Sequence, residues 1–245
     1  MKVKGILFDF GFTLFYFEDV SLDKYMDCYK RGLQKSVDYL KKSEILNDDI
    51  AVKEFFKLFK NKRGYFFKQS RKTKNEYPTS YIFQEVLENL DKDVYKELSD
   101  LYHSYEAEEW KPFEYTKDTL EKISKFDDVK MGVLSNHPNH SMVKTLLKKY
   151  DLYQYFDVVV TSAKFKRRKP DPEIFYHALK KMGLENEAEN CIICGDEYAD
   201  IMGGYRAGMQ TILCKRIYEF PFEKEINVPN LITIENISEI IQHIS

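Results

Sequence analysis

The sequence lacks any apolar run near the length of about eighteen residues that spans a bilayer, so we predict no transmembrane helix. Its opening stretch, MKVKGILFDF, lacks the long apolar region and the small-residue cleavage site of a signal peptide. Neither sign of charge dominates, because the formal net charge is −2, which disfavours nucleic acids and anionic membranes as partners. We therefore expect a cytoplasmic protein with no nucleic-acid partner and no membrane partner.

Cysteine is also scarce, since four residues do not make a disulfide scaffold in a chain of 245 residues. Cys191 and Cys194 form a C-x-x-C pattern, which would suit a zinc or redox site. They lie in the apolar run CIICG, which is typical of a buried strand. Residues three apart on a strand point to opposite faces, so we expect the two sulfur atoms to diverge and both cysteines to belong to the core.

Strand-like runs are missing between about Phe17 and Lys111, where apolar residues recur at helical spacing instead. A continuous apolar strand is expected before this block, over Val3–Phe10. Within the block we expect only helices, over Leu22–Leu40, Asp49–Phe59, Ser80–Leu90 and Lys92–Tyr105.

After the helical block, strands and helices alternate along the chain. The strands are expected at Lys130–Ser135, Phe156–Thr161, Cys191–Gly195, Thr211–Lys215 and Leu231–Ile234. The helices are expected at Asp118–Phe126, at Ser141–Tyr150, from Asp171-Pro172 to Gly183, near Ile201–Ala207 and from Ser238. This order predicts an α/β fold, a doubly wound (Rossmann-like) parallel sheet core with an inserted all-helical cap domain. The core would comprise residues 1–16 and 112–245, and the cap residues 17–111.

Polar residues follow four of the predicted strands, at the edge where such a sheet places its active site. A carboxylate at the end of a buried strand requires cations or hydrogen bonds around it. A lysine at the mouth of a helix and paired acids would supply charges for an anion and a hard metal ion. Together these groups have the equipment of phosphoryl transfer. The residues are Asp9 in ILFDFGFTL, Ser135 and Asn136 in VLSN, Lys169 in RKPDP, and Asp196 and Asp200 in GDEYAD.

These four motifs, in this order, resemble those of the haloacid dehalogenase superfamily, in its phosphatase-like branch with a helical cap inserted after the first motif. The resemblance covers the whole predicted core and extends to the segment GGYRAGM at residues 203–209. It implies a magnesium-dependent phosphatase that hydrolyses a small phosphorylated metabolite through an aspartyl-phosphate on Asp9. The protein is expected to be a monomer or a homodimer.

The resemblance also implies a role for each motif residue. Asp9, Ser135 and Lys169 would be catalytic, as nucleophile, phosphoryl ligand and charge stabiliser. Asn136 and Thr13 would bind substrate. Magnesium would be held by Asp9, by the backbone carbonyl of Gly11, and by Asp196 and Asp200.

Ordinary structural roles remain open for some of these residues. Thr13 also suits a turn or a cap. Asp200 also suits the capping of the helix that follows it. Lys169 lies among Lys164, Lys166, Arg167 and Arg168 and could be a solvated cation.

Gly11 departs from the family's pattern, because most phosphatases of this family carry an aspartate there as the general acid and base. Such a group typically contributes about 10²–10⁴-fold to the rate. Without it, the enzyme would favour good leaving groups or take a proton from another residue, with His137 and Glu197 as candidates. On this hypothesis Gly11→Asp speeds the hydrolysis of alkyl phosphates.

Two alternatives remain open. The chain could be a phosphate-binding protein of the same fold that has lost turnover, which Gly11 alone supports. It could also be a metal-independent 2-haloacid dehalogenase, since that branch lacks the second acid as well, although Asp196 and Asp200 argue for a metal. A phosphomutase is disfavoured, because it would need the missing acid in both half-reactions.

The expected cap contains a basic stretch, Lys60–Lys74, with aromatic residues interleaved. Contact with a nucleotide or another polyanion is one interpretation. A solvated helix face or loop, with Gly64 as a hinge or turn, is the interpretation we favour in the absence of a nucleic-acid motif.

Overall fold

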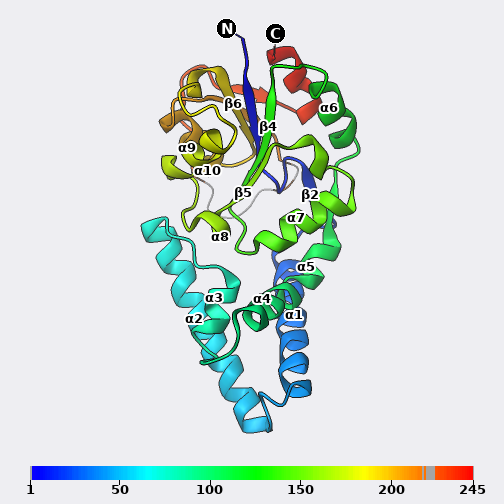
Figure 1. Cartoon of the computed structure of the whole chain (residues 1–245), viewed down its shortest axis with the longest axis vertical. Coiled ribbons are helices and arrows are strands. Elements are labelled where there is room, and N and C mark those ends of the chain that lie inside the picture. Colours follow the sequence, from blue (N-terminus) through cyan, green and yellow to red (C-terminus); the bar gives the residue numbers. More distant parts are fainter. Residues whose placement is uncertain (1, 217, 219–223, 245) are drawn as a thin grey trace.

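A six-stranded, all-parallel sheet lies at one end of the molecule in the computed structural model, which describes residues 2–216, 218 and 224–244 (Figure 1). Its order is β5–β4–β1–β6–β7–β8. The strands are β1 (Gly5–Phe8), β4 (Lys130–Ser135), β5 (Val158–Thr161), β6 (Cys191–Gly195), β7 (Gln210–Cys214) and β8 (Ile232–Ile234). Met1 and Ser245, the outer limits of the expected core, lie outside the described residues.

The strand order reverses beside β1, which pairs with β4 on one side and with β6 on the other. A doubly wound sheet opens a crevice at such a point, beyond the carboxyl ends of its strands. The predicted α/β fold is thus confirmed, and each expected strand is present with limits that differ by up to two residues at either end.

Helices cover both faces of the sheet (Figure 1). On one face lie α9 (Pro172–Lys181) and α10 (Tyr198–Arg206), and on the other α6 (Thr116–Ile123), α7 (His140–Lys149) and η3 (Ile237–His243). The remaining short elements are η1 (Tyr153–Tyr155), α8 (Ser162–Phe165) and η2 (Ala188–Asn190). As expected, Asp171 caps α9 and Pro172 is its first residue. The expected last helix is present as a 3₁₀ helix that begins at Ile237, one residue before the expected Ser238.

The two cysteines of the C-x-x-C pattern lie on opposite faces of β6. Cys194 packs in the apolar cluster that contains Ile6, and Cys191 packs in the cluster that contains Leu7. Both thiols are buried and free. The prediction that they belong to the core is confirmed.

The segment from Leu22 to Glu109 forms a separate layer of helices beyond the sheet (Figure 1). It comprises α1 (Leu22–Lys42), α2 (Asp49–Thr73), α3 (Thr79–Gln84), α4 (Lys92–Tyr102) and α5 (Ser104–Glu109). These helices enclose an apolar core of their own, with Phe59 and Phe83 fully buried. None of the described helices is both long and apolar enough to cross a membrane.

Three features of this layer differ from the prediction. The expected helix Lys92–Tyr105 ends at Tyr102 as α4, and a second helix, α5, begins at Ser104. The helix α2 continues without a break through the basic stretch to Thr73, and Gly64 lies inside it with open space beside it. Gly64 is therefore neither a turn nor a break in the helix. The helix α3 ends at Gln84, well short of the expected Leu90.

A two-stranded antiparallel ribbon joins the helical layer to the sheet. It pairs β2 (Phe15–Phe17) with β3 (Trp110–Pro112), and Phe17 lies opposite Trp110. These strands, at the limits of the helical block, were missed because three residues are too few to show an alternating pattern. Because β2 leads into the helical layer and β3 leads out of it, the ribbon holds the two connections between this layer and the sheet side by side.

Candidate active site

The four predicted motifs meet at the carboxyl edge of the sheet. Asp9 directly follows β1, whose four residues are all buried, and its side chain is almost buried as well. Lys169 lies in the loop before α9, and its Nζ is 2.7 Å from Oδ1 of Asp9. Such a buried carboxylate requires a cation close to it, and Lys169 provides one.

The ammonium group of Lys169 has three acceptors. Besides Asp9, its Nζ donates to Oδ1 of Asp200 at 2.5 Å and to the carbonyl oxygen of Leu134 at 2.9 Å. Burial alone would lower the pKa of Lys169, but Asp200 and Asp9 outweigh it and raise that pKa above its ordinary value. Lys169 is thus a permanent cation with a fixed position, and the reading of it as a solvated surface residue was wrong.

Three carboxylates gather around this lysine. Asp9, Asp196 and Asp200 each place an oxygen within 4.8 Å of the others, and all three are buried. Burial and the charge of Asp9 raise the pKa of Asp200 to about 8. Burial, Asp9 and Asp200 also raise the pKa of Asp196 well above its usual range. The three carboxylates outnumber the cations of the described residues that contact them, Lys169 and Arg216, and this excess of acids favours a bound divalent cation.

Asp200 has a structural role as well as an electrostatic one. Its Oδ2 accepts from the backbone N–H of Glu197 at 3.3 Å, as part of the capping box that begins α10. Asp200 therefore both caps α10 and takes part in the cluster of charged side chains around Lys169. Gly195 allows this close approach, because a Cβ there would lie 2.3 Å from Cγ of Asp200.

The two polar residues at the end of β4, Ser135 and Asn136, make different contacts. Ser135 ends the strand and lines a cavity above Asp9. Asn136 instead pairs with the backbone of Lys169 in both directions, accepting from its N–H at 2.8 Å and donating to its carbonyl oxygen at 3.0 Å. These two hydrogen bonds hold the loop that carries Lys169, and Asn136 also lines the cavity, so its predicted contact with a substrate stays a prediction.

Asp196 has two further partners. The Thr13 hydroxyl donates to its Oδ1 at 3.3 Å, and Nε of Arg216 lies 3.1 Å from its Oδ2. Thr13 is fully buried and is not among the residues that line the cavity, so its contact in this structure is with Asp196, and its predicted role in substrate binding stays a prediction. Arg216, which lies just after β7, was not anticipated, because no motif marks it in the sequence.

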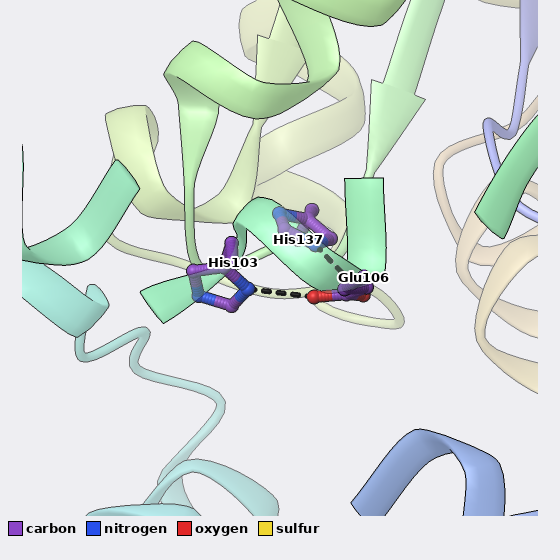
Figure 2. A group of neighbouring side chains, drawn as sticks. All are labelled: His103, Glu106 and His137. Atoms are coloured by element: carbon purple, nitrogen blue, oxygen red, sulfur yellow. Dashed lines mark hydrogen bonds and ion pairs between the residues drawn. The ribbon is translucent and has the colours of Figure 1, made fainter. Parts of the chain in front are cut away.

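A second polar cluster connects the helical layer to the sheet. Glu106 contacts both His103 and His137, with Oε2 at 2.6 Å from Nδ1 of His103 and Oε1 at 3.3 Å from Nε2 of His137 (Figure 2). The remaining ring nitrogens contact the Thr79 hydroxyl at 2.8 Å and the Asn139 carbonyl oxygen at 2.9 Å. These residues could hold a metal ion by proximity, but every ring nitrogen already has a protein partner.

The pKa values of the two histidines shift in opposite directions, although both rings contact Glu106. Burial lowers the pKa of His103, and its contact with Glu106 does not overcome this. Burial also opposes protonation of His137, but Glu106 outweighs it and raises the pKa of His137. The candidate replacement acid His137 is therefore more readily protonated than an ordinary histidine.

A cavity of about 650 Å³ lies between the helical layer and the carboxyl edge of the sheet. Its floor includes Asp9, Gly11, Ser135, Lys169 and Asp196. The candidate acids His137 and Glu197 line it too. Burial raises the pKa of Glu197, against the effect of Lys169, so this residue also holds its proton to a higher pH than usual. Three cations of the basic stretch line the opposite wall, namely Arg63, Arg71 and Lys74.

Comparisons with known proteins identify the family. The family model described as "Haloacid dehalogenase-like hydrolase" matches residues 44–214. The chain is 28% identical over 156 residues to the 6-phosphogluconate phosphatase of Escherichia coli (strain K12), covering 62% of this chain and 68% of that one. It is 29% identical over 150 residues to the pyrophosphatase PpaX of Bacillus cereus (strain AH820), covering 55% and 68%.

Solved structures show the same fold. A 2-haloacid dehalogenase from Pseudomonas syringae pv. Tomato DC3000 superimposes with a TM-score of 0.63 at 20% identity, over 98% of this chain and 97% of that one. A HAD phosphatase from Thermococcus onnurineus gives 0.58 at 21% identity, over 99% and 97%. Because the family model spans most of the chain and the fold agrees, the protein is a hydrolase that belongs to the haloacid dehalogenase-like family.

Proposed function

We propose that this protein is a magnesium-dependent phosphatase that forms an aspartyl-phosphate on Asp9 and releases it to water. The observation that carries the proposal is the buried contact of 2.7 Å between Lys169 Nζ and Asp9 Oδ1, with Asp196 and Asp200 in the same cluster. We also propose that residues 17–111 form a cap over a core made of residues 1–16 and 112–245. The relatives named phosphatase and pyrophosphatase support the choice of a phosphate substrate.

The donor set fits a hard divalent cation. Such an ion prefers carboxylate and carbonyl oxygens, and here three buried carboxylates have too little positive charge around them. Asp9 and Asp196 would hold it, with the Gly11 carbonyl, and Asp200 would complete or support the set. When bound, Mg²⁺ would neutralise charge that develops on the phosphoryl oxygens.

The protein's own residues define the first step. Lys169 holds Oδ1 of Asp9, and no hydrogen bond among the described residues engages Oδ2, which is therefore the oxygen available for attack. In this step the bond from Asp9 to phosphorus forms while the bond from phosphorus to the leaving oxygen breaks. Ser135 and Lys169 would bind the transferring group, and Asn136 holds the lysine loop in place.

The second step releases phosphate when water attacks the phosphorus of the acyl phosphate and Asp9 departs as a carboxylate. Gly11 supplies no acid or base to either step. The enzyme would therefore favour leaving groups that need no proton, such as aryl or acyl phosphates, or use His137 or Glu197, both of which line the cavity. Its substrate would be a small phosphorylated metabolite, selected by the residues on the cavity wall opposite Asp9.

The test is hydrolysis of para-nitrophenyl phosphate with and without Mg²⁺, in the wild type and in Asp9→Asn. We expect activity that requires Mg²⁺ and disappears in Asp9→Asn. Mass spectrometry of acid-quenched wild-type protein should locate phosphate on the peptide that contains Asp9. The control Asp127→Asn changes an exposed acid and should behave as the wild type. An active Asp9→Asn variant would refute the proposal.

One observation favours a second candidate. Arg216 already supplies a cation to Asp196, with Nε at 3.1 Å from Oδ2, as a site that works without metal would require. A metal-independent 2-haloacid dehalogenase would release chloride from 2-chloropropionate in the presence of a chelator. Chloride release under those conditions, with no hydrolysis of para-nitrophenyl phosphate, would replace the phosphatase by this activity.

A further inference from the structure

The cavity above Asp9 is much larger than a phosphoryl group needs. Its volume of about 650 Å³ lies within the range of sites that hold whole metabolites or cofactors. The floor of the cavity contains the groups assigned to the phosphoryl group. The opposite wall, formed by the helical layer, therefore faces the rest of the substrate.

One face of α2 makes up much of that wall. Its lining residues stand at positions 63, 66, 67, 70 and 71, a spacing of i, i+3, i+4, i+7 and i+8 that places them on a single side of the helix. Two aromatic rings and a hydroxyl alternate with three cations on this face. We call it the cationic face of α2, and it comprises Arg63, Phe66, Phe67, Ser70 and Arg71 of the helix together with Lys74, the residue that caps its carboxyl end.

The three cations of this face have no carboxylate partner among the described residues. The guanidinium of Arg63 lies over the Tyr29 ring, 4.7 Å from its centroid, and that of Arg71 lies over the Phe67 ring at 5.8 Å. Lys74 donates to the carbonyl oxygen of Arg71 at 2.6 Å. Aromatic faces orient these cations but do not neutralise their charge.

A lysine outside the cationic face shows the contrast. Lys62, one residue before Arg63, forms an ion pair with Glu85 at 3.1 Å and does not line the cavity. Lys62 is therefore neutralised by an acid, whereas no carboxylate of the described residues pairs with the three cations of the cationic face. Burial and the nearby positive charges of Lys224 and Arg168 lower the pKa of Lys74, as expected where cations converge without an anion.

The end of the cationic face is fixed relative to the reaction centre. The backbone N–H of Arg168 donates to the carbonyl oxygen of Lys74 at 2.8 Å, and that of Glu76 donates to Lys166 at 2.9 Å. Glu76 also forms an ion pair with Arg168, 2.5 Å away. Because Arg168 directly precedes Lys169, these contacts hold the cationic face and Lys169 at a set separation.

We propose that the cationic face of α2 binds a second anionic group of the substrate, a carboxylate or a phosphate, while the phosphoryl group to be removed lies at Asp9. This inference rests on the proposed phosphatase function and specifies its substrate class as phosphate esters with a second anion on the leaving group. Guanidinium groups suit both anions, because their paired N–H groups match two oxygens at once.

The test measures binding of non-hydrolysable ligands to the whole protein by calorimetry, with Mg²⁺ present. The ligands are an alkyl monophosphonate, the bisphosphonate of the same chain length, and the matching phosphonocarboxylate, each in several chain lengths. We expect at least one two-anion ligand to bind about tenfold or more tightly than the monophosphonate. Comparison of the two double-anion series identifies the second group as carboxylate or phosphate.

Variants of the cationic face then locate the effect. Arg63→Gln, Arg71→Gln and Lys74→Gln should each reduce the preference for two anions. The controls Lys68→Gln and Lys72→Gln remove the same charge from exposed positions of α2 outside the cavity lining, and they should retain the preference. Equal affinity for one and two anions in the wild type would overturn the inference, and so would equal losses in the control variants.

Hydrolysis of para-nitrophenyl phosphate, measured in parallel, separates this inference from the proposed function. Hydrolysis without any preference for two anions would overturn the inference and leave the phosphatase proposal standing. Binding of two-anion ligands that depends on the cationic face, in a protein without hydrolysis, would support the anion site and overturn the phosphatase proposal.

Discussion

The indole of Trp110 occupies the space into which a side chain at Gly11 would project. A Cβ atom added at Gly11 would lie 2.9 Å from Cη2 of that ring. Trp110 is almost fully buried, and the rings of Phe10, Phe12 and Phe17 pack against it with centroids 5.7, 5.3 and 5.2 Å away. The packing of Trp110 therefore leaves no room for an aspartate side chain at position 11.

This relationship changes the expected outcome of Gly11→Asp. Since Trp110 cannot move freely, the single substitution should overpack the site and lower the free energy of unfolding by about 1–3 kcal/mol. The double variant Gly11→Asp with Trp110→Leu makes room for the carboxyl group. Relative to Trp110→Leu alone, it should hydrolyse alkyl phosphates faster by a factor approaching 10².

The measurement is kcat/KM for an alkyl and an aryl phosphate in the wild type, both single variants and the double variant. Acceleration confined to the alkyl substrate would support a missing proton donor, because an aryl leaving group needs no proton. Equal rates for the double variant and Trp110→Leu would show that the site lacks no acid.

Lys169 offers a separate test of the buried charge cluster. Lys169→Met removes the cation and leaves Asp9, Asp196 and Asp200 close together, so without divalent cations it should destabilise the fold by about 3–5 kcal/mol. Adding Asp200→Asn removes one of the opposed charges and should recover part of that loss. Urea unfolding of the two single variants and the double variant gives the coupling energy. Strictly additive effects would contradict the direct contact between Lys169 and Asp200.

Divalent cations should stabilise the protein through the same carboxylates. At a Mg²⁺ concentration about a hundred times its dissociation constant, binding to the native state adds about 2.7 kcal/mol to the free energy of unfolding. Thermal melting with Mg²⁺ and with a chelator should show this increase in the wild type. Asp196→Asn should reduce it, whereas Asp127→Asn, at an exposed position, should not. An unchanged increase in Asp196→Asn would place the ion elsewhere.

The sheet and its motifs were predictable from the sequence because they depend on local patterns. Continuous apolar runs marked the buried strands, and the acids after two of these runs marked the active edge, so Asp9 and Asp196 could be placed together. Lys169 could be added to them because it stands just before a predicted helix. The Asp-Pro pair at residues 171 and 172 likewise marked the start of α9.

Contacts between distant parts of the chain were not predictable in this way. The approach of Trp110 to Gly11, the ion pair of Arg216 with Asp196, and the contacts of Glu106 with two histidines depend on how the helical layer and the loops fold over the sheet. No spacing rule connects such positions. The cationic face of α2 is an intermediate case, because its helical spacing was visible in the sequence but the surface it faces was not.

The contact between Glu106 and His137 predicts how stability depends on pH. The pKa of His137 is raised above its unfolded value of about 6.5. Its contribution to stability is therefore complete below that unfolded value and is lost as the pH rises through the folded pKa. Glu106 has a pKa below its usual range, because its two histidine partners outweigh the opposing effect of burial. The contribution of Glu106 is present above its unfolded value of about 4.5 and is lost only in stronger acid.

Glu106→Gln removes the charge that sustains the protonated form of His137, and burial then lowers the pKa of His137. The loss of stability in this variant should be greatest between about pH 4.5 and 6.5 and should shrink as the pH rises further. Urea unfolding across this range checks the effect, and Glu108→Gln, at an exposed position two residues away, is the matched control. A loss that does not change with pH would mean that Glu106 acts only through neutral hydrogen bonds and that His137 is not held as a cation.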